Sequence, residues 1–343
     1  MVFDFAYGQA DNDPSHYFLK ADSPLLAAIK MALQLNKPLL ITGEPGTGKT
    51  QLAYWAAWYL SRDKQNHSAA FIDKPFVFNT KTYSAGKDLL YTYDAISHFQ
   101  RKDKNPEHFI HLAALGLAIV QTWGRYEAIN KFGLQDMPSL KSPGDKSPVK
   151  VSDSPASCVV LIDEIDKAPR DFPNDLLNEI ETGYFQIQEM DREIFQNKSN
   201  ESRILTIITS NEERNLPDAF LRRCLFFNIP FPGKEELKEI VRYRMPLFSN
   251  DPDDMLRGLY SDAIDFFVKA RESANVKKPA TSELLDWIKI LHLNKVFESH
   301  KDFTKVSGWD EASQHSLKIS LAAIFKNKAD LKYFRDKFLA EGE

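Results

Sequence analysis

The segment Gly43–Thr50, GEPGTGKT, constrains the fold of this chain more than any other. It follows a short β-rich run, Pro38–Thr42, and precedes a segment with a helical apolar stripe, Thr50–Leu60. A glycine-rich turn between a strand and a helix points backbone N–H groups at phosphate oxygens, and the helix N-terminus adds partial positive charge. Lys49 is expected to reach the β- and γ-phosphates, and the Thr50 hydroxyl to ligate Mg²⁺. We therefore expect ATP phosphates to be bound by Gly43, Glu44, Pro45, Gly46, Thr47, Gly48, Lys49 and Thr50.

A second signal is the run VVLIDE, in which four apolar residues end in Asp163 and Glu164. Such a run fits a buried strand that delivers two acids to the carboxyl edge of a parallel sheet, where ligands bind in open α/β folds. Asp163 would hold Mg²⁺ together with Thr50, and Glu164 would orient or deprotonate a water molecule. Alone, the pattern is weak; paired with the phosphate loop, it predicts a nucleotide hydrolase.

Composition limits the other possibilities. The chain has 343 residues, which suggests two domains, and a net charge of −4, which argues against a polycationic nucleic-acid coat. Its two cysteines, Cys158 and Cys224, lie in apolar runs and are predicted to be buried thiols in a reducing compartment; two are too few for a zinc cluster. No signal peptide is evident, and the longest apolar run, near Phe109–Val120, is too short to span a bilayer. We expect a cytoplasmic protein without membrane contact.

The order of elements predicts an α/β fold followed by a helical domain. Short apolar runs alternate with helical patterns up to about residue 232, which is typical of a parallel sheet covered by helices. Beyond it only helical patterns occur. We therefore expect an α/β nucleotide-binding core over 1–232 and an all-helical lid over 233–343. The five expected strands are Pro38–Thr42, Pro75–Thr80, Cys158–Asp163, Ile204–Thr209 and Leu225–Ile229.

Two segments interrupt this alternation. The residues from about 81 to 132 are expected to be a mostly helical insert. The residues from about 133 to 157 are rich in Ser, Pro, Lys and Asp and are expected to form an exposed, mobile loop, with a plain disordered insertion as the alternative. Further on, Tyr184–Phe195 reads as a hairpin with its turn near Met190-Asp191.

Taken together, these motifs resemble the AAA+ ATPases, and within them the MoxR-type group. The stretch LIDEIDKAPRDFPNDLLNEIETGYFQI resembles that group's Walker B strand, the helix after it and a β-hairpin. Ile204–Asn211 resembles the sensor 1 strand, and Pro217–Arg223 resembles the box that carries an arginine finger. The resemblance covers roughly residues 20–335, and it implies a P-loop core with a parallel five-stranded sheet and a helical lid.

The resemblance also implies roles for single residues. Asn211, at the end of its strand, would fix the lytic water, although a strand-end asparagine on its own is more often a turn cap. Arg222 or Arg223 would reach the γ-phosphate of a neighbouring subunit, and the other arginine would be an ordinary solvated charge. The expected catalytic residues are therefore Glu164, Asn211, Arg222 and Arg223.

In this family ATP would lie between core and lid, in a ring that is most often a hexamer. The insert at 81–132 and the hairpin would project from one face of the ring to grip a partner or substrate. Alternatively, the stretch FIHLAALGLAIV simply covers a sheet edge. The partner would be a protein, in this group often one with a von Willebrand A domain. The stretch KDLLYTYDAISHF resembles members found in bacterial conflict or defence systems.

One position departs from the family pattern. Many AAA+ lids carry a sensor 2 arginine near the start of a helix, where this chain has Glu283. Either Lys277 or Lys278 substitutes, or the lid senses nucleotide less directly. Adenine would be recognised partly by the segment before the first helix, where Tyr17, Phe18 and Leu19 are candidates; ordinary packing is the alternative reading of these three.

The sequence thus predicts an ATP-hydrolysing AAA+ subunit with a chaperone-like role, which remodels or activates a partner protein. A nucleic-acid motor similar to the AAA+ subunit of restriction systems is an alternative, but the acidic balance and the lack of interleaved aromatic and basic residues weigh against it. A slow, nucleotide-gated switch is a second alternative, against which the pair Asp163-Glu164 and the arginines weigh. A P-loop kinase would need neither the asparagine nor the arginine box.

Overall fold

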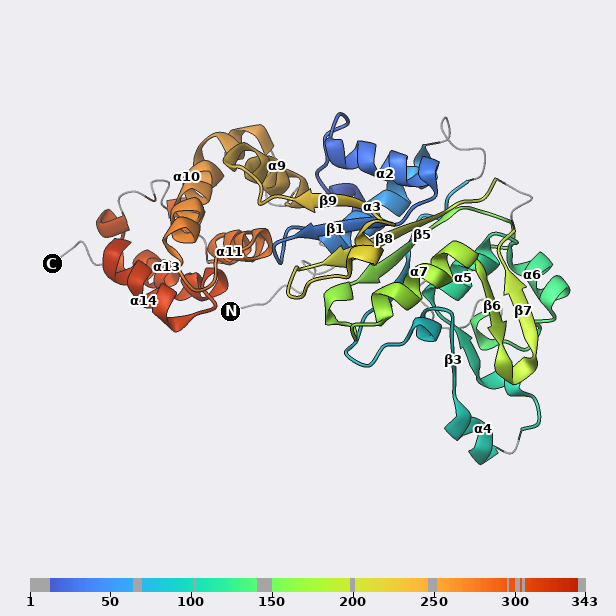
Figure 1. The fold of residues 1–343 in the computed structure, drawn as a ribbon. Helices are drawn as coiled ribbons and strands as arrows, with labels where there is room; N and C mark the ends of the chain where they lie inside the picture. Colours follow the sequence, from blue (N-terminus) through green and yellow to red (C-terminus); the bar gives the residue numbers. More distant parts are fainter. Residues whose placement is uncertain are drawn as a thin grey trace. The chain divides into compact units, whose positions relative to one another are not determined.

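The computed structural model describes residues 13–63, 70–101, 103–140, 150–197, 201–245, 252–294, 296–299, 303 and 306–338. The chain forms two compact units (Figure 1). The first, here called the α/β unit, comprises 19–43 and 49–228. The second, the helical unit, comprises the described residues before 19, the short segment Glu44–Gly48, and the chain from Ile229 onward.

The α/β unit is built on a five-stranded sheet. Its strands follow the order β2-β5-β8-β1-β9, and the neighbours run parallel, with Val160 opposite Thr206 and Leu40 opposite Ile208. The α/β class, the parallel sheet of five strands and the helical region after it are confirmed. The strands are β1 (Leu39–Gly43), β2 (Phe76–Asn79), β5 (Cys158–Asp163), β8 (Ile204–Ser210) and β9 (Leu225–Ile229).

Helices cover this sheet because its central strands are apolar on both faces. All of β1 is buried, as is β5 up to Asp163 at its end. Helix α2 (Pro24–Leu35) begins where the Ser23 hydroxyl accepts a hydrogen bond from the Leu25 N–H at 3.2 Å, and it packs on β1 and β8. Helix α3 (Lys49–Arg62) contacts β1, β5 and β8.

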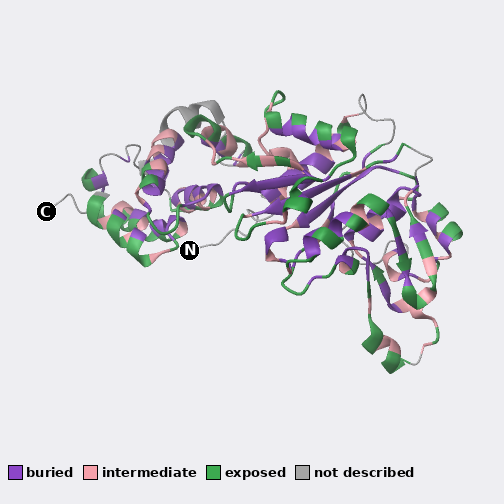
Figure 2. Ribbon diagram, in the orientation of Figure 1, coloured by how far each residue is buried: buried purple, intermediate pink, exposed green. Residues whose placement is uncertain are grey.

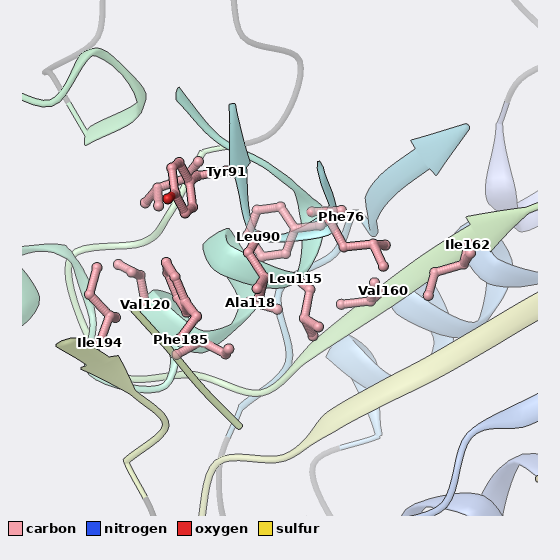
Figure 3. Close-up of a cluster of buried hydrophobic side chains, with 14 of the residues drawn as sticks. Phe76, Leu90, Tyr91, Leu115, Ala118, Val120, Val160, Ile162, Phe185 and Ile194 are labelled. Carbon is pink, nitrogen blue, oxygen red and sulfur yellow. The ribbon is translucent and has the colours of Figure 1, made fainter. Parts of the chain in front are cut away.

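The segment 81–132 combines helices with a small sheet. It contains a two-stranded antiparallel sheet, and its helix α5 is buried and packs on β2 and β5. Figure 3 shows Leu115 and Ala118 of this helix beside Val160 of the main sheet. The stretch FIHLAALGLAIV therefore covers the edge strand β2, as the alternative expected. The elements are η2 (Gly86–Leu89), β3 (Tyr91–Tyr93), α4 (Ala95–Arg101), η3 (Pro106–Phe109), β4 (Ile110–Leu112), α5 (Ala114–Gln121) and α6 (Arg125–Phe132).

The expected hairpin is present and packs on this insert. Strands β6 (Tyr184–Ile187) and β7 (Arg192–Phe195) follow helix α7 (Phe172–Thr182) and are joined through η6 (Gln188–Met190) and a left-handed Asp191. The Trp123 indole N–H of the insert donates to the Phe195 carbonyl at 2.6 Å. Insert and hairpin are thus one packed region of the α/β unit.

The described parts of the segment 133–157 differ from the exposed loop that their composition predicts. Leu134, Met137 and Leu140, the last residue of η4 (Pro138–Leu140), are buried, and so are Val151 and Ala156. Figure 2 colours the ribbon by burial. Leu134, Met137, Leu140 and Val151 belong to the core of the α/β unit, which the overall composition of the segment does not indicate. The residues 141–149 lie outside the described part of the chain.

The helical unit has its own core of aromatic and aliphatic side chains. Trp287 is fully buried, its ring stacks on Phe266, and Phe303 and Phe334 pack around them. No helix in the described part of the chain is long and apolar enough to cross a membrane. The elements are η1 (Pro14–His16), α9 (Lys234–Arg244), α10 (Pro252–Ser273), α11 (Thr281–Leu293), α12 (Val296–Ser299), η8 (Val306–Gly308), α13 (Glu311–Ile324) and α14 (Lys328–Phe338).

Candidate ATP-hydrolysis site

The glycine-rich segment forms the tight turn that phosphate binding requires. Gly46 and Gly48 adopt φ angles of 78° and 87°, which side chains with a Cβ rarely adopt. Within the turn, the Thr47 hydroxyl donates to the Glu44 carbonyl at 2.9 Å. The segment ends β1 and opens α3, as the sequence predicts.

Lys49 is a buried cation at the start of α3. Its side chain is 6% exposed, and its Nζ donates to the Gly43 carbonyl at 2.8 Å. Burial lowers the pKa of Lys49, while the charges of Asp166, Asp163 and Glu164 oppose that effect. The ammonium attracts phosphate oxygens, and the neighbouring acids favour the protonated form that carries this charge.

Thr50 and Asp163 meet although 113 positions separate them in the chain. The Thr50 hydroxyl donates to the Asp163 carboxylate, at 3.0 Å from Oδ1 and 3.1 Å from Oδ2, and the Thr209 hydroxyl donates to Oδ1 at 2.5 Å. A hydroxyl and a carboxylate side by side are the oxygen ligands that Mg²⁺ prefers, with phosphate oxygens and water completing its shell. The described residues contain no cluster of three or more His, Cys, Asp or Glu side chains that could hold a metal by itself. The Thr50–Asp163 pair therefore fits Mg²⁺ bound with a nucleotide.

Glu164 and Asn211 are also brought together. Strand β8 lies between β1 and β5, so its end places Asn211 between the phosphate loop and the two acids. The Asn211 side-chain amide donates to Glu164 Oε1 at 3.2 Å. The other carboxylate oxygen, Oε2, accepts a hydrogen bond from Lys167 Nζ, and this bond raises the pKa of Lys167.

The backbone around Glu164 is unusual. Glu164 adopts a left-handed conformation with φ 57°, and its N–H donates to the Thr209 hydroxyl at 2.9 Å. The chain then enters a short turn, η5 (Ile165–Lys167). A non-glycine residue held in this region carries backbone strain, which the surrounding structure has to maintain.

Three residues of this network were missed by sequence reasoning: Asp166, Lys167 and Thr209. Asp166 is 3% exposed and accepts hydrogen bonds from the N–H groups of Asn211, at 3.2 Å, and Glu213, at 3.3 Å. It thereby fixes the end of β8. The polar residues within LIDEIDK and IITSN could have indicated further site residues. Which of them face the site, however, depends on the pairing of β5 with β8.

The structure distinguishes the two candidate arginines, which follow helix α8 (Asp218–Leu221). Both side chains are exposed. Arg223 Nε lies 3.7 Å from Glu181 Oε1 on α7. Within the described part of the chain, Arg222 forms no side-chain ion pair. Neither arginine is brought to Lys49 or Glu164 by a described contact.

In the helical unit, Glu283 has a structural role. Its Oε2 accepts a hydrogen bond from the Ala280 N–H at 2.6 Å and so caps the start of α11. Lys277 and Lys278 are exposed. A buried arginine that the sequence did not single out, Arg271, lies near the end of α10.

The adenine candidates have defined surroundings. A Cβ built on Gly48 would lie 3.1 Å from Cε2 of Tyr17, so the Tyr17 ring is adjacent to the phosphate loop. Burial raises the pKa of Tyr17. The Phe18 ring packs against Tyr243 at a centroid distance of 5.3 Å. Leu19 is half-buried. Adenine contact by these residues stays a prediction.

Known proteins resemble this chain only in structure. No protein-family model matches it, and no curated protein does. A point mutant of Thermotoga maritima RuvB is 13% identical over 87% of this chain and 67% of its own, with a TM-score of 0.44. Domain III of the T. maritima replication initiation protein DnaA is 14% identical over 92% of this chain and 98% of its own, with a TM-score of 0.43.

A third neighbour is NtrX from Brucella abortus in complex with ATP, 13% identical over 83% of this chain and 55% of NtrX, with a TM-score of 0.45. This chain thus spans little more than half of the NtrX chain. At such identities and TM-scores the neighbours assign no activity, so function is argued here from the chain's own residues.

Proposed function

We propose that this chain is an ATP-hydrolysing subunit of an AAA+ machine that requires Mg²⁺. The observation that carries the proposal is the network at the carboxyl ends of three adjacent strands. There the phosphate-loop hydroxyl of Thr50 bonds to Asp163, and the amide of Asn211 bonds to Glu164. The separation of one acid for a metal from a second acid for water is the arrangement that phosphoryl transfer to water needs.

Each residue then has a distinct role. Lys49 and the N–H groups of the loop bind the phosphates, and Thr50 and Asp163 hold Mg²⁺, which neutralises phosphate charge when bound. Asn211 orients a water molecule and Glu164 accepts its proton while the water oxygen bonds to the γ-phosphorus. The bond from phosphorus to the β–γ bridging oxygen breaks, which yields ADP and phosphate. Arg222 stabilises charge on the γ-phosphate of a neighbouring subunit.

The proposed assembly and partner of this chain follow from the sequence resemblance to the MoxR-type group. We propose a homo-oligomeric ring, most readily a hexamer, that remodels or activates a partner protein, with a von Willebrand A domain protein as a candidate. The packed region of insert and hairpin is the candidate partner surface, because its helix α4 stands out from the α/β unit (Figure 1) and exposes Ile96 and Phe99.

The test compares two variants with wild type for ATP binding and phosphate release. Lys49→Ala should lose ATP binding, and Glu164→Gln should keep ATP and Mg²⁺ binding but lose turnover by about 10²- to 10⁴-fold, the usual contribution of a general base. Circular dichroism checks that both remain folded. Wild-type ATP affinity in Lys49→Ala, or turnover within a few-fold of wild type in Glu164→Gln, would refute the assignment.

A slow nucleotide-gated switch is a second candidate, because both oxygens of the Glu164 carboxylate are occupied by Lys167 and Asn211. A base held in this way has a low intrinsic rate until the pair opens. Turnover of the wild-type protein, measured alone and with its co-purifying partner, separates a switch from a continuous ATPase.

A further inference from the structure

The tip of the phosphate loop packs within the helical unit. By its contacts, Glu44–Gly48 belongs to that unit. A Cβ built on Gly46 would lie 2.6 Å from Ala280 Cβ and 2.7 Å from Ser282 Oγ, which is closer than real contacts allow. The loop tip therefore lies directly against the start of α11.

Arg271 is the charged group at this contact. Its side chain is 10% exposed, and its guanidinium lies 3.5 Å from the centroid of the Phe231 ring. Nη1 donates to the Pro279 carbonyl, and Nη2 lies 2.5 Å from Glu44 Oε2. A buried guanidinium with three such contacts has a fixed position, because Nη1, Nη2 and the planar face of the group are each held by a different partner.

The Glu44 carboxylate is a negative charge within the phosphate loop, and Arg271 forms an ion pair with it. A carboxylate in a phosphate-binding loop repels the phosphate oxygens that the loop has to bind. The Glu44 carboxylate is half-exposed, and its ion pair with Arg271 neutralises its charge. Arg271 also needs Glu44, since a buried cation without a counter-ion is strongly unfavourable.

We propose that Arg271 is a positioning residue for the triphosphate: it neutralises Glu44 and holds the tip of the phosphate loop, Glu44–Gly48, at the start of α11. This inference rests on the proposed function. It assigns the cationic role expected at position 283 to a residue twelve positions earlier, which acts through Glu44 rather than by touching the nucleotide. A nucleotide that binds the loop then stabilises the Arg271–Glu44 arrangement, so that occupancy of the loop is linked to the state of the helical unit.

The test measures Mg²⁺–ATP affinity by equilibrium binding for Arg271→Met, Glu44→Gln and the double variant. Arg271→Met should weaken binding at least tenfold, because the Glu44 charge is then unmasked. Glu44→Gln removes the repelling charge and sets the reference affinity for the double variant. The double variant should return to within threefold of Glu44→Gln, since it no longer carries the repelling charge. A residue with only a structural role would not show this rescue.

Controls separate the possible failures. Lys277→Ala and Lys278→Ala, which remove the exposed cations nearby, should bind like wild type. If Arg271→Met does not fold, Arg271→Gln keeps a donor for the Pro279 carbonyl and tests the same charge. Wild-type affinity in the folded Arg271 variants, or a double variant as weak as Arg271→Met, overturns the inference while the proposed function stands. A wild-type protein that binds no ATP overturns both.

Discussion

At the scale of single residues, the site places a cation beside Glu164, the proposed catalytic base. Lys167 bonds to one oxygen of Glu164 and Asn211 to the other. A general base accepts a proton through a carboxylate oxygen that faces the water, so an ammonium at that oxygen competes with the water. Both side chains of the Lys167–Glu164 pair are more than one-third exposed, which limits how much the pair contributes.

Lys167→Met should therefore raise basal ATP turnover by about two- to fivefold, the range of an exposed ion pair of up to about 1 kcal/mol. ATP affinity should not change, because Lys167 bonds to the base and not to the phosphate loop. The measurement is steady-state phosphate release over a range of ATP concentrations. Lys238→Met, which removes a similar pair with Glu235 in α9, is the matched control and should have no effect. A fall in turnover would mean that Lys167 orients Glu164 for catalysis.

At the scale of elements, two acids stabilise the connection from α10, which carries Arg271, to the start of α11. Glu283 caps α11 through the Ala280 N–H. Asp330, at the start of α14, is 3% exposed and accepts hydrogen bonds from the N–H groups of Asn275, Val276 and Lys277. The connection between α10 and α11 is thus fixed at both ends by carboxylates rather than by apolar contacts alone.

Glu283→Ala should lower the free energy of unfolding by about 0.5–2 kcal/mol, the usual cost of a lost helix cap. ATP affinity should change little, because Glu283 bonds to its own helix. Urea denaturation measures the free energy of unfolding, and equilibrium binding measures the ATP affinity. Asp286→Ala, an exposed acid one turn further along α11, is the control. A large loss of ATP affinity in Glu283→Ala, with stability unchanged, would contradict a capping role.

Asp330→Ala should cost more, about 2–3 kcal/mol, because it leaves three backbone N–H groups without their acceptor. The cost should depend on pH. Burial raises the pKa of Asp330, but the three backbone N–H bonds lower it further, so its pKa lies below 3.8. The carboxylate's contribution is therefore complete above pH 3.8 and is lost as pH falls through the lowered pKa. Urea denaturation should give the same difference in free energy of unfolding between wild type and Asp330→Ala at pH 7 and pH 5. At pH 3 this difference should be smaller.

At the scale of the whole molecule, catalysis is predicted to be shared between subunits. Within the described residues no contact brings Arg222 or Arg223 to the acids of the site. Arg223 has a partner within its own chain in Glu181, whereas Arg222 is exposed. An arginine that acts in trans has to be available at the surface before assembly, so Arg222 is the better candidate for the finger.

Arg222→Ala should bind ATP normally yet lose turnover by about 10³-fold or more, and Arg223→Ala should lose little. Mixing Arg222→Ala with Lys49→Ala subunits should recover part of the activity, because the second variant supplies an arginine to an ATP-loaded neighbour. Recovery should grow with protein concentration, as assembly requires. Sedimentation with a non-hydrolysable ATP analogue checks that mixed assemblies form. Full activity of Arg222→Ala on its own would remove the finger from this position.

The sequence by itself determined the parts that depend on local pattern. The phosphate loop, strands β5 and β9, and the hairpin turn at Asp191 all coincide with the expectation. Apolar runs, helical stripes and turn residues encode these elements over short stretches of chain. The order of motifs was also enough to predict that Thr50 meets Asp163, because parallel strands end at one edge of a sheet.

The tertiary structure decided what depends on pairing between distant segments. Asp166 and Thr209 join the site because β8 pairs with β5, and Arg271 meets Glu44 although 227 positions separate them. The buried ends of the segment 133–157 also differ from their composition. Burial and ion pairing depend on which surfaces meet in space. A local pattern shows that a residue is polar, but only the fold determines whether that residue faces water, a phosphate loop or another charge.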